Sequence, residues 1–353
     1  FARFVRLCHE NGIRVVVDGV FNHTGREFFA FQDIREKREA SPYKDWYRGV
    51  NFGWGSPLGD PFGYEAWQGH FELPCLNLRN PEVRQYLFDS IQFWVDNFNI
   101  DGIRLDCANV LDFGFMKELR EKTSAMKPDF WLMGEVIHGE YNRWVNPEML
   151  HSVTNYELHK ALYSGHNDHN YFEIAHNVRR LEAVGKSLYT FVDNHDEDRI
   201  ASKLNHPANL FPVYQLLFTL PGIPSIYYGS EWGIEGKRSR TSDEVLRPAL
   251  NLSDMLGKAP ELASHIAALG KIHTENDAFH NGSYKELLLT NRQYAFSRSG
   301  EHGTVISAVN NDEQPASISI PLPCAASDAV SLLPGEIPFS LENGRLSVTL
   351  PAN

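Results

Sequence analysis

Four short segments of the sequence carry the residues best suited to chemistry. They read DGVFNHTG (18–25), DGIRLDCAN (101–109), MGEVIH (133–138) and FVDNHDED (191–198). Each places a carboxylate at the end of an apolar run, and three of them also contain a histidine. One such carboxylate is commonly a helix cap. Four in corresponding positions instead indicate a shared site, provided that the elements before them are neighbouring strands.

The elements before these segments form a repeating pattern. Apolar runs typical of buried strands alternate with helical stretches, and the clearest helix covers Pro81 to Phe98, with Asn80 as its N-cap. Its predicted inward face consists of Val83, Leu87, Ile91, Trp94, Val95 and Phe98. The predicted strands end near Asp18, Leu105, Glu135, Asn155, Asp193 and Tyr228. This alternation predicts a parallel sheet whose functional residues lie at the carboxyl ends of the strands.

Two observations favour an eight-fold barrel over an open nucleotide-binding sheet. The sequence begins within a helix that ends at Gly12, so the strand that precedes this helix is expected upstream. The next run, IRVVVDGV, reads as a strand buried on both faces, and no Gly-rich phosphate loop follows it. We therefore predict an α/β fold, a (β/α)8 TIM barrel whose first two strands are missing from this sequence.

The barrel pattern is interrupted once and then gives way to a different one. Residues 24–80 are too long for a plain loop and predict an inserted subdomain, called the B subdomain below. Residues 1–23 and 81–277 form the predicted barrel. From residue 278 to 353 short strands separated by turn residues predict an antiparallel β-sandwich domain. Its strands read KELLLTNRQYAFSRS, GTVISAVNN, ASISIPL and RLSVTL.

The composition excludes some classes of partner. The 353 residues carry a formal net charge of -12, which argues against nucleic acid or an anionic membrane surface. A neutral, hydroxyl-rich ligand suits the chain better. Cys8, Cys75, Cys107 and Cys324 lie without metal-type spacing, so we expect unpaired thiols, a pattern that slightly favours a cytoplasmic over a secreted location.

The residue types at the strand ends point to glycoside hydrolysis. Carboxylates converge there beside Arg104, His23 and His195, without a His/Cys metal set. An acid and a nucleophile that flank a glycosidic bond need such a set of carboxylates. A divalent-metal site of the enolase kind is the alternative, but it usually needs a lysine base, and none of the four segments contains a lysine.

In this order, the four segments resemble the conserved regions of the α-amylase family of retaining glycoside hydrolases. The resemblance implies that Asp106 is the nucleophile, Glu135 the general acid/base and Asp196 the third carboxylate, which grips sugar hydroxyls. These three are the predicted catalytic residues.

The same resemblance implies roles for five further residues. His23 and His195 would contact the attacked sugar, and Arg104 would hold the nucleophile ionised. Asp18 and Asn22 would form a structural pair at the site.

The spacing of the residues supports the assignments of the nucleophile and the acid. Arg104 lies two residues before Asp106, so both side chains point to one face of the strand, and the cation favours the ionised carboxylate. Glu135 follows FWLMG, an apolar strand that offers no cation. Such surroundings favour the protonated form that a proton donor needs.

No cofactor is required for this chemistry, although the resemblance raises the question of a structural calcium ion. Asn22 is the one candidate ligand. Two departures from the family weaken the prediction: DCAN (106–109) lacks the Lys-His that many members place after the nucleophile, and Cys75 replaces a common Asp.

The predicted function is retaining, endo-type hydrolysis of α-1,4-glucosidic bonds in starch or maltodextrins. Segments such as SPYKDWY and SVTNYEL resemble the cyclomaltodextrinase and neopullulanase branch, which is an alternative, as is a 4-α-glucanotransferase. Members of that branch are often homodimers, so a homodimer is an open alternative. A non-catalytic, amylase-like sugar-binding protein is the alternative from another class. In each case the partner is an α-glucan or maltooligosaccharide.

The acidic segment after the fifth predicted strand divides into functional and structural residues. His195 and Asp196 belong to the predicted site, while Asp193 and Asn194 are expected to brace the strand end. Glu197 and Asp198 are interpreted as a solvated loop, with Arg199 as their counter-charge. Four tryptophans could stack on sugar rings or pack in the core: Trp46, Trp54, Trp67 and Trp144.

Overall fold

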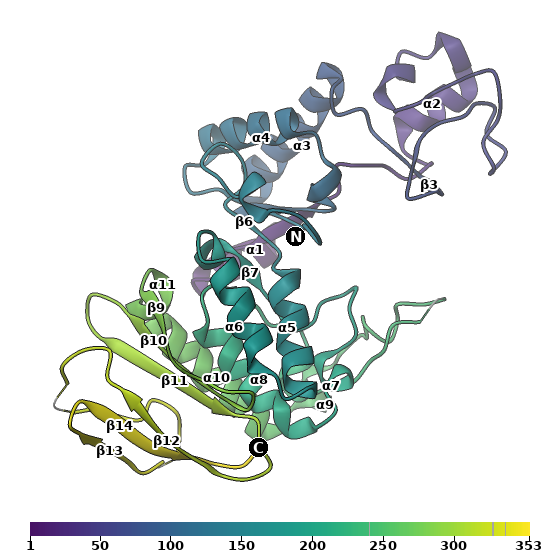
Figure 1. Ribbon diagram of the computed structural model, residues 1–353. Coiled ribbons are helices and arrows are strands. Elements are labelled where there is room, and N and C mark those ends of the chain that lie inside the picture. The colour runs from purple at the N-terminus through teal and green to yellow at the C-terminus, as the bar shows by residue number, and fades with distance from the viewer. Residues whose placement is uncertain (240, 327, 336) are drawn as a thin grey trace. The chain divides into compact units, whose positions relative to one another are not determined.

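The computed structural model describes residues 1–239, 241–326, 328–335 and 337–353 (Figure 1). In it the chain forms two compact units, Phe1–Thr154 and Asn155–Asn353. No helix in the described parts of the chain is both long and apolar enough to cross a membrane. All four cysteines are unpaired, as predicted.

The first unit contains a parallel sheet with helices between its strands. The four strands pair in the order β1-β4-β5-β6, each parallel to the next. The strands are β1 (Val16–Gly19), β4 (Gly102–Leu105), β5 (Trp131–Gly134) and β6 (Ser152–Val153). The helices are α1 (Ala2–Glu10), α3 (Pro81–Phe98) and α4 (Phe113–Met126), with single turns η3 (Ala108–Val110) and η4 (Tyr141–Arg143). The predicted alternation of strands and helices is confirmed here.

Helix α3 has the predicted limits because its first turn is capped as the sequence indicates. The side chain of Asn80 accepts a hydrogen bond from the backbone N–H of Glu82 at 2.8 Å, and Pro81 occupies the first helical position, where no N–H is needed. Of the predicted inward face, Val83, Leu87 and Ile91 are buried. The remaining three residues, Trp94, Val95 and Phe98, are half-buried.

The first strand differs from its prediction. β1 was expected to be buried on both faces, but Val16 is 39% exposed. In the described sheet β1 pairs only with β4 and lies at the edge, so one side has no neighbouring strand to cover it. In α1, likewise, only Val5 is buried, while Phe1 and Phe4 are exposed.

Residues 24–80 have an aromatic core of their own, which agrees with an inserted subdomain. Phe31 lies at its centre, with ring centroids 5.3 Å from Tyr47, 5.4 Å from Phe62 and 5.0 Å from Tyr64. Its elements are α2 (Phe29–Lys37), η1 (Arg38–Ala40), η2 (Lys44–Trp46) and an antiparallel pair, β2 (Ala66–Trp67) and β3 (His70–Pro74). The three domain boundaries drawn from the sequence stay predictions.

A buried carboxylate holds the loop of this segment together. The Asp60 side chain has no exposed surface and forms ion pairs with Arg26 at 2.5 Å and Arg35 at 3.2 Å. It also accepts hydrogen bonds from Ser56 Oγ at 2.7 Å and Tyr64 Oη at 2.9 Å. Burial alone would raise the pKa of Asp60, but the hydrogen bonds, above all that from Arg26, outweigh it and lower the pKa.

We expect Asp60→Ala to lower the free energy of unfolding by about 3 kcal/mol, because it removes a fully buried carboxylate and leaves the half-buried guanidinium groups of Arg26 and Arg35 without this partner. Urea denaturation at pH 7 measures this loss. Asp129→Ala, which removes a surface ion pair with Arg14, is the matched control and should cost less than about 1 kcal/mol. Equal losses in the two variants would contradict the role of Asp60.

The same carboxylate predicts a pH dependence of stability. Because the folded-state pKa of Asp60 lies below its ordinary value of 3.8, its contribution is present above that value and is lost as the pH falls through the folded-state pKa. The difference in stability between wild type and Asp60→Asn should therefore shrink on acidification below about pH 4.

The second unit begins with helices packed around a two-stranded parallel ladder. β7 (Tyr189–Thr190) pairs with β8 (Ile223–Pro224). The helices are α5 (Tyr156–Asn167), α6 (Tyr171–Arg180), α7 (Ile200–Lys203), α8 (Leu210–Thr219), α9 (Leu252–Met255), α10 (Pro260–Glu275) and α11 (Asp277–His280). Single turns are η5 (Gly185–Ser187), η6 (Pro207–Asn209) and η7 (Ser230–Trp232). Leu162, Ile174, Val213 and Leu217 belong to its buried core.

Both strands of this ladder end before the predicted positions near Asp193 and Tyr228. Beyond Thr190, side chains hold the backbone in a loop: Asp193 accepts from Ile200 N at 2.8 Å, and Asn194 accepts from Asp196 N at 2.9 Å. The segment after the strand is therefore a side-chain-braced loop.

The C-terminal part consists of two antiparallel sheets, as predicted. One has the order β11-β10-β9 and the other β12-β14-β13. The strands are β9 (Ser283–Leu289), β10 (Gln293–Ser299), β11 (Thr304–Asn310), β12 (Ala316–Pro321), β13 (Phe339–Glu342) and β14 (Arg345–Leu350). The sequence did not predict β13, a short and mostly exposed strand without a clear apolar face.

Candidate active site

In the first unit the register of three parallel strands brings the predicted residues to one edge of the sheet. Asp18 of β1 pairs with Arg104 of β4, so their side chains point to the same face. The ladder continues one step beyond the strands, because Asp106 N donates to Gly19 O and Glu135 N donates to Leu105 O. Asp106 and Glu135 therefore follow neighbouring strands at matching positions.

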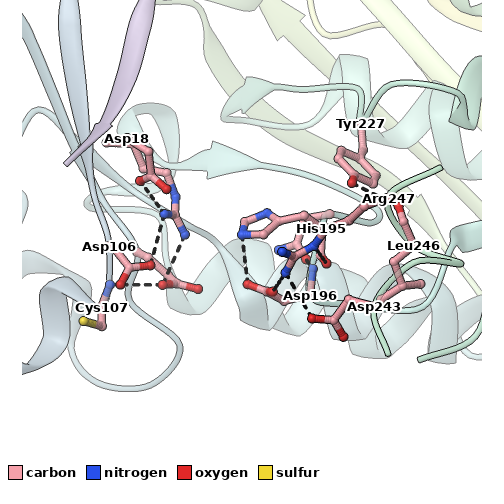
Figure 2. A network of polar contacts seen from close by, with 12 residues as sticks. Asp18, Asp106, Cys107, His195, Asp196, Tyr227, Asp243, Leu246 and Arg247 are labelled. Carbon is pink, nitrogen blue, oxygen red and sulfur yellow. Dashed lines mark hydrogen bonds and ion pairs between the residues drawn. The ribbon is translucent and has the colours of Figure 1, made fainter. Parts of the chain in front are cut away.

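One guanidinium connects the three carboxylates (Figure 2). Arg104 Nη1 lies 2.6 Å from Asp18 Oδ1 and 3.3 Å from Asp106 Oδ1, and Nη2 lies 3.2 Å from Glu135 Oε2. Burial opposes the charge on Arg104, but the three carboxylates outweigh it and raise its pKa, so the side chain stays cationic. The strand before Glu135 offers no cation, as the sequence indicated, but Arg104 of the neighbouring strand places one beside Glu135.

Cys107 provides a further contact to the buried Glu135. Its backbone N–H donates to Glu135 Oε2 at 3.1 Å, from a turn in which Cys107 has a φ of 39°. The left-handed conformation costs a residue with a side chain of the order of 1–3 kcal/mol. Gly134 makes room for this turn, since a Cβ there would lie 2.7 Å from the Cβ of Ala108.

His23 is held beside the nucleophile candidate as a neutral ring. Its ring stacks on Trp67, with centroids 6.1 Å apart and 17° between the planes, and its Nδ1 lies 3.3 Å from Asn22 Nδ2. Burial lowers the pKa of His23, and the nearby charge of Asp106 opposes this only in part. The imidazole can therefore act as a hydrogen-bond partner without a charge at neutral pH.

The surroundings of Asn22 do not match a calcium site. Asn22 is buried, and its amide contacts the His23 ring and the sulfur of Cys75, the latter at 3.9 Å. Calcium requires six to eight oxygen ligands. A ring nitrogen and a thiol beside one amide do not fit that ion.

In the second unit His195 and Asp196 form a cluster with an arginine that the sequence did not single out. Asp196 Oδ2 lies 3.0 Å from His195 Nε2, and Asp196 Oδ1 lies 2.8 Å from Arg247 Nη2 (Figure 2). Arg247 Nε also donates to the backbone oxygen of His195 at 3.1 Å, and Nη2 lies 3.3 Å from Asp243. Arg247 therefore fixes both the side chain of Asp196 and the backbone before it.

The neighbouring residues brace this cluster, partly as predicted. Asp193 is buried and accepts a hydrogen bond from Ser230 Oγ at 2.7 Å, and Asn194 donates to Tyr156 Oη at 3.1 Å. Arg199 lies in a different setting from the solvated loop in which it was expected to act as a counter-charge, although its charge does favour the ionised form of Asp193. The Arg199 side chain is completely buried and donates to backbone oxygens of Tyr228 and of Leu246.

Glu197 is not merely a solvated loop residue, as the sequence suggested. It pairs with Lys203 Nζ at 2.6 Å and lies 3.7 Å from His159 Nε2. The contact with His159, with that from Lys203, lowers the pKa of Glu197 to about 2. A permanently ionised Glu197 thus ties the loop of Asp196 to α7 and α5.

Three of the residues in these contacts were missed or left undecided by the sequence. Trp67 stands beside His23, whereas Trp46 and Trp144 are buried core residues and Trp54 is exposed. The position of Cys107 directly after the nucleophile candidate could have identified it as a residue of the site, but a thiol there has no obvious role in hydrolysis. No local pattern indicated Arg247, because it is 51 positions from Asp196 along the chain and lies in a segment without regular structure.

The first unit alternates parallel strands with helices and carries carboxylates at the ends of neighbouring strands. These features define an α/β protein with a site of several carboxylates. We call Asp18, Asp106 and Glu135 around Arg104 the polyacidic site. Residues 1–258 match the family model described as "Alpha amylase, catalytic domain". The chain belongs to this family. The match implies a (β/α)8 barrel followed by a C-terminal β domain, while the absence of two strands from this sequence stays a prediction.

The chain is similar to several characterised proteins. It is 32% identical to a cyclomaltodextrinase of Geobacillus thermopakistaniensis, over 98% of this chain and 59% of that protein. It is 33% identical to neopullulanase 2 of Thermoactinomyces vulgaris, over 71% of this chain and 43% of that protein. The chain thus covers less than two thirds of these relatives. Among solved structures, the debranching enzyme from Nostoc punctiforme matches with a TM-score of 0.87 and 27% identity, over 100% of this chain and 77% of that one.

Proposed function

We propose that the protein cleaves α-1,4-glucosidic bonds in cyclodextrins and short maltodextrins, with retention of anomeric configuration. The observation that carries the proposal is the single guanidinium of Arg104 that contacts both Asp106 and Glu135. This contact supports a pair of carboxylates at one edge of the sheet, with Asp106 as the nucleophile and Glu135 as the acid/base. A double displacement requires such a pair.

Each carboxylate has a distinct role in this proposal. Asp106, beside a cation and partly accessible, attacks the anomeric carbon and forms a glycosyl ester. Glu135, which is buried, first gives its proton to the departing glycosidic oxygen and then takes one from the incoming water. In the first unit His23 donates to a sugar hydroxyl, and in the second unit Asp196 and His195 contact sugar hydroxyls.

The substrate proposal follows the named relatives rather than the first prediction from the sequence. That prediction was endo-type hydrolysis of starch, with cyclomaltodextrinase and neopullulanase activity as an alternative. The similarity to a cyclomaltodextrinase and a neopullulanase supports the alternative better. A homodimer remains a prediction, which sedimentation equilibrium would test.

Side-by-side assays on β-cyclodextrin, pullulan and soluble starch test the proposal. Reducing ends should appear from β-cyclodextrin and pullulan at higher kcat/KM than from starch, and the newly formed ends should be α-anomers by proton NMR. Faster attack on starch would restore the first prediction. Products longer than the substrate would indicate a glucanotransferase, and sugar binding without any cleavage would indicate a non-catalytic protein.

We expect Arg247→Ala to lower kcat/KM about tenfold, because Asp196 loses a charge-assisted hydrogen bond that orients it. Arg247→Lys should recover only part of this loss, since an ammonium group cannot contact both Asp196 and the backbone oxygen of His195 as the guanidinium does. Steady-state kinetics on β-cyclodextrin provide the measurement.

Lys271→Ala is the control for this pair, since it removes an exposed cation of α10 whose ammonium group pairs with Glu275 at 3.8 Å. It should leave kcat/KM unchanged. If Arg247→Ala also leaves kcat/KM unchanged while Asp196→Asn lowers it strongly, Arg247 has no part in positioning Asp196.

A further inference from the structure

Three side chains at the polyacidic site form a constellation that includes a thiol, which the proposed hydrolysis does not use. One ligand atom each from His23, Asp106 and Cys107 lies within 4.8 Å of the other two. In the described part of the chain this is the one such group of three or more His, Cys, Asp or Glu residues. All three belong to the first unit, and they come from the loops that follow β1 and β4.

This mixture of donors is selective for one class of cation. A ring nitrogen, a carboxylate oxygen and a sulfur are the ligands of zinc and of cadmium, whereas magnesium and calcium require oxygen ligands. Around tetrahedral zinc, neighbouring ligand atoms lie about 3.5 Å apart, as follows from metal–ligand bonds of 2.0–2.3 Å. The observed group must contract by roughly 1 Å, which rotations of the Asp106 and Cys107 side chains can supply.

The surrounding structure already orients the ligands. Trp67 stacks on the ring of His23, and the left-handed turn fixes the position of Cys107. If Asp106 turns toward a metal, Arg104 keeps its contacts with Asp18 and Glu135.

We propose that His23, Asp106 and Cys107 bind zinc or a similar thiophilic divalent cation, and that the bound ion inhibits the enzyme by occupying its nucleophile. Three protein ligands leave a fourth position for water, and the thiol releases its proton to solvent when the metal binds. The inhibitory consequence rests on the proposed function of Asp106. The metal site itself does not.

Binding is tested first, on the full chain and without any substrate. Isothermal titration with zinc chloride should give a single tight site in the wild type and at least about tenfold weaker binding in Cys107→Ala and in His23→Ala. Cadmium should produce the ultraviolet thiolate-to-metal absorption band in the wild type, and Cys107→Ser should abolish it. Circular dichroism of each variant verifies that it is folded.

Cys324→Ala is the matched control, because Cys324 is an exposed thiol outside the constellation. This variant should bind zinc and show the cadmium band like the wild type. Wild-type affinity in Cys107→Ala, or loss of the band in Cys324→Ala instead of Cys107→Ser, would overturn the metal site.

Inhibition is tested second, with the zinc-free rate of each variant as its own reference. Zinc should lower the apparent kcat/KM for β-cyclodextrin, and Cys107→Ala should need at least about tenfold more zinc for the same effect. Magnesium should have no effect. Zinc inhibition that is equally strong in Cys107→Ala and in the wild type would overturn the assignment to the nucleophile. A protein that binds zinc through Cys107 but cleaves no glucan would refute the proposed function and leave the metal site standing.

Discussion

Asp106→Asn should lower kcat on β-cyclodextrin by about 10³-fold or more, because the amide cannot form the glycosyl ester on which the double displacement depends. Glu135→Gln should cause a similar loss on natural substrates, since proton transfer to the leaving oxygen contributes about 10²–10⁴-fold. Reducing-sugar assays measure both losses. Asp89→Asn and Glu121→Gln, which change exposed carboxylates of α3 and α4, should retain wild-type rates.

The two losses can be separated by a substrate with an activated leaving group and by added azide. The first step on an aryl α-maltoside needs no proton donor, so Glu135→Ala should form the glycosyl ester and transfer it to azide with overall retention. Asp106→Ala forms no ester, and azide that fills the vacated space should give the inverted glycosyl azide. If the two variants exchange these products, the roles of Asp106 and Glu135 are exchanged as well.

The first part of the candidate site could be predicted because it depends on local periodicity. Asp18 and Arg104 lie one residue before the ends of neighbouring parallel strands, and Asp106 follows Arg104 by two positions, directly after the strand. These facts follow from the period of a β-strand, and the register of β1 with β4 agrees with them. Helix α3 was predictable for the same reason, since its cap, its proline and its apolar stripe are all local signals.

The contacts that the sequence did not predict are all tertiary. Glu135 receives its cation from Arg104, a residue of the neighbouring strand, so the composition of its own strand could not reveal it. Arg199 is a charged residue in an acidic segment, yet backbone oxygens from two distant loops surround it. Arg247 reaches Asp196 from a segment without regular structure. Local patterns give no information on such pairings.

Replacement of Arg104 is expected to have the second largest effect on activity. Arg104→Gln leaves Asp18, Asp106 and Glu135 without their shared cation, and the loss of one partner from a buried ionic group costs about 3–5 kcal/mol. If this cost appears in the transition state, kcat/KM falls by about 10²–10³-fold. Arg104→Lys should recover only a small part, because a single ammonium group cannot reach three carboxylates in the geometry of the planar guanidinium.

The pH profile distinguishes this role of Arg104 from a merely structural one. The carboxylates raise the pKa of Arg104, so the guanidinium stays a cation over the pH range of an assay. Because Arg104→Gln removes this cation from beside the carboxylates, the acidic limb of the profile of kcat/KM against pH should move to higher pH in that variant. Arg14→Gln, which removes an exposed ion pair with Asp129, should leave the profile in place. An Arg104→Gln variant that loses activity equally at every pH would show that the guanidinium acts by packing alone, because a structural defect has no reason to follow the protonation of Asp106.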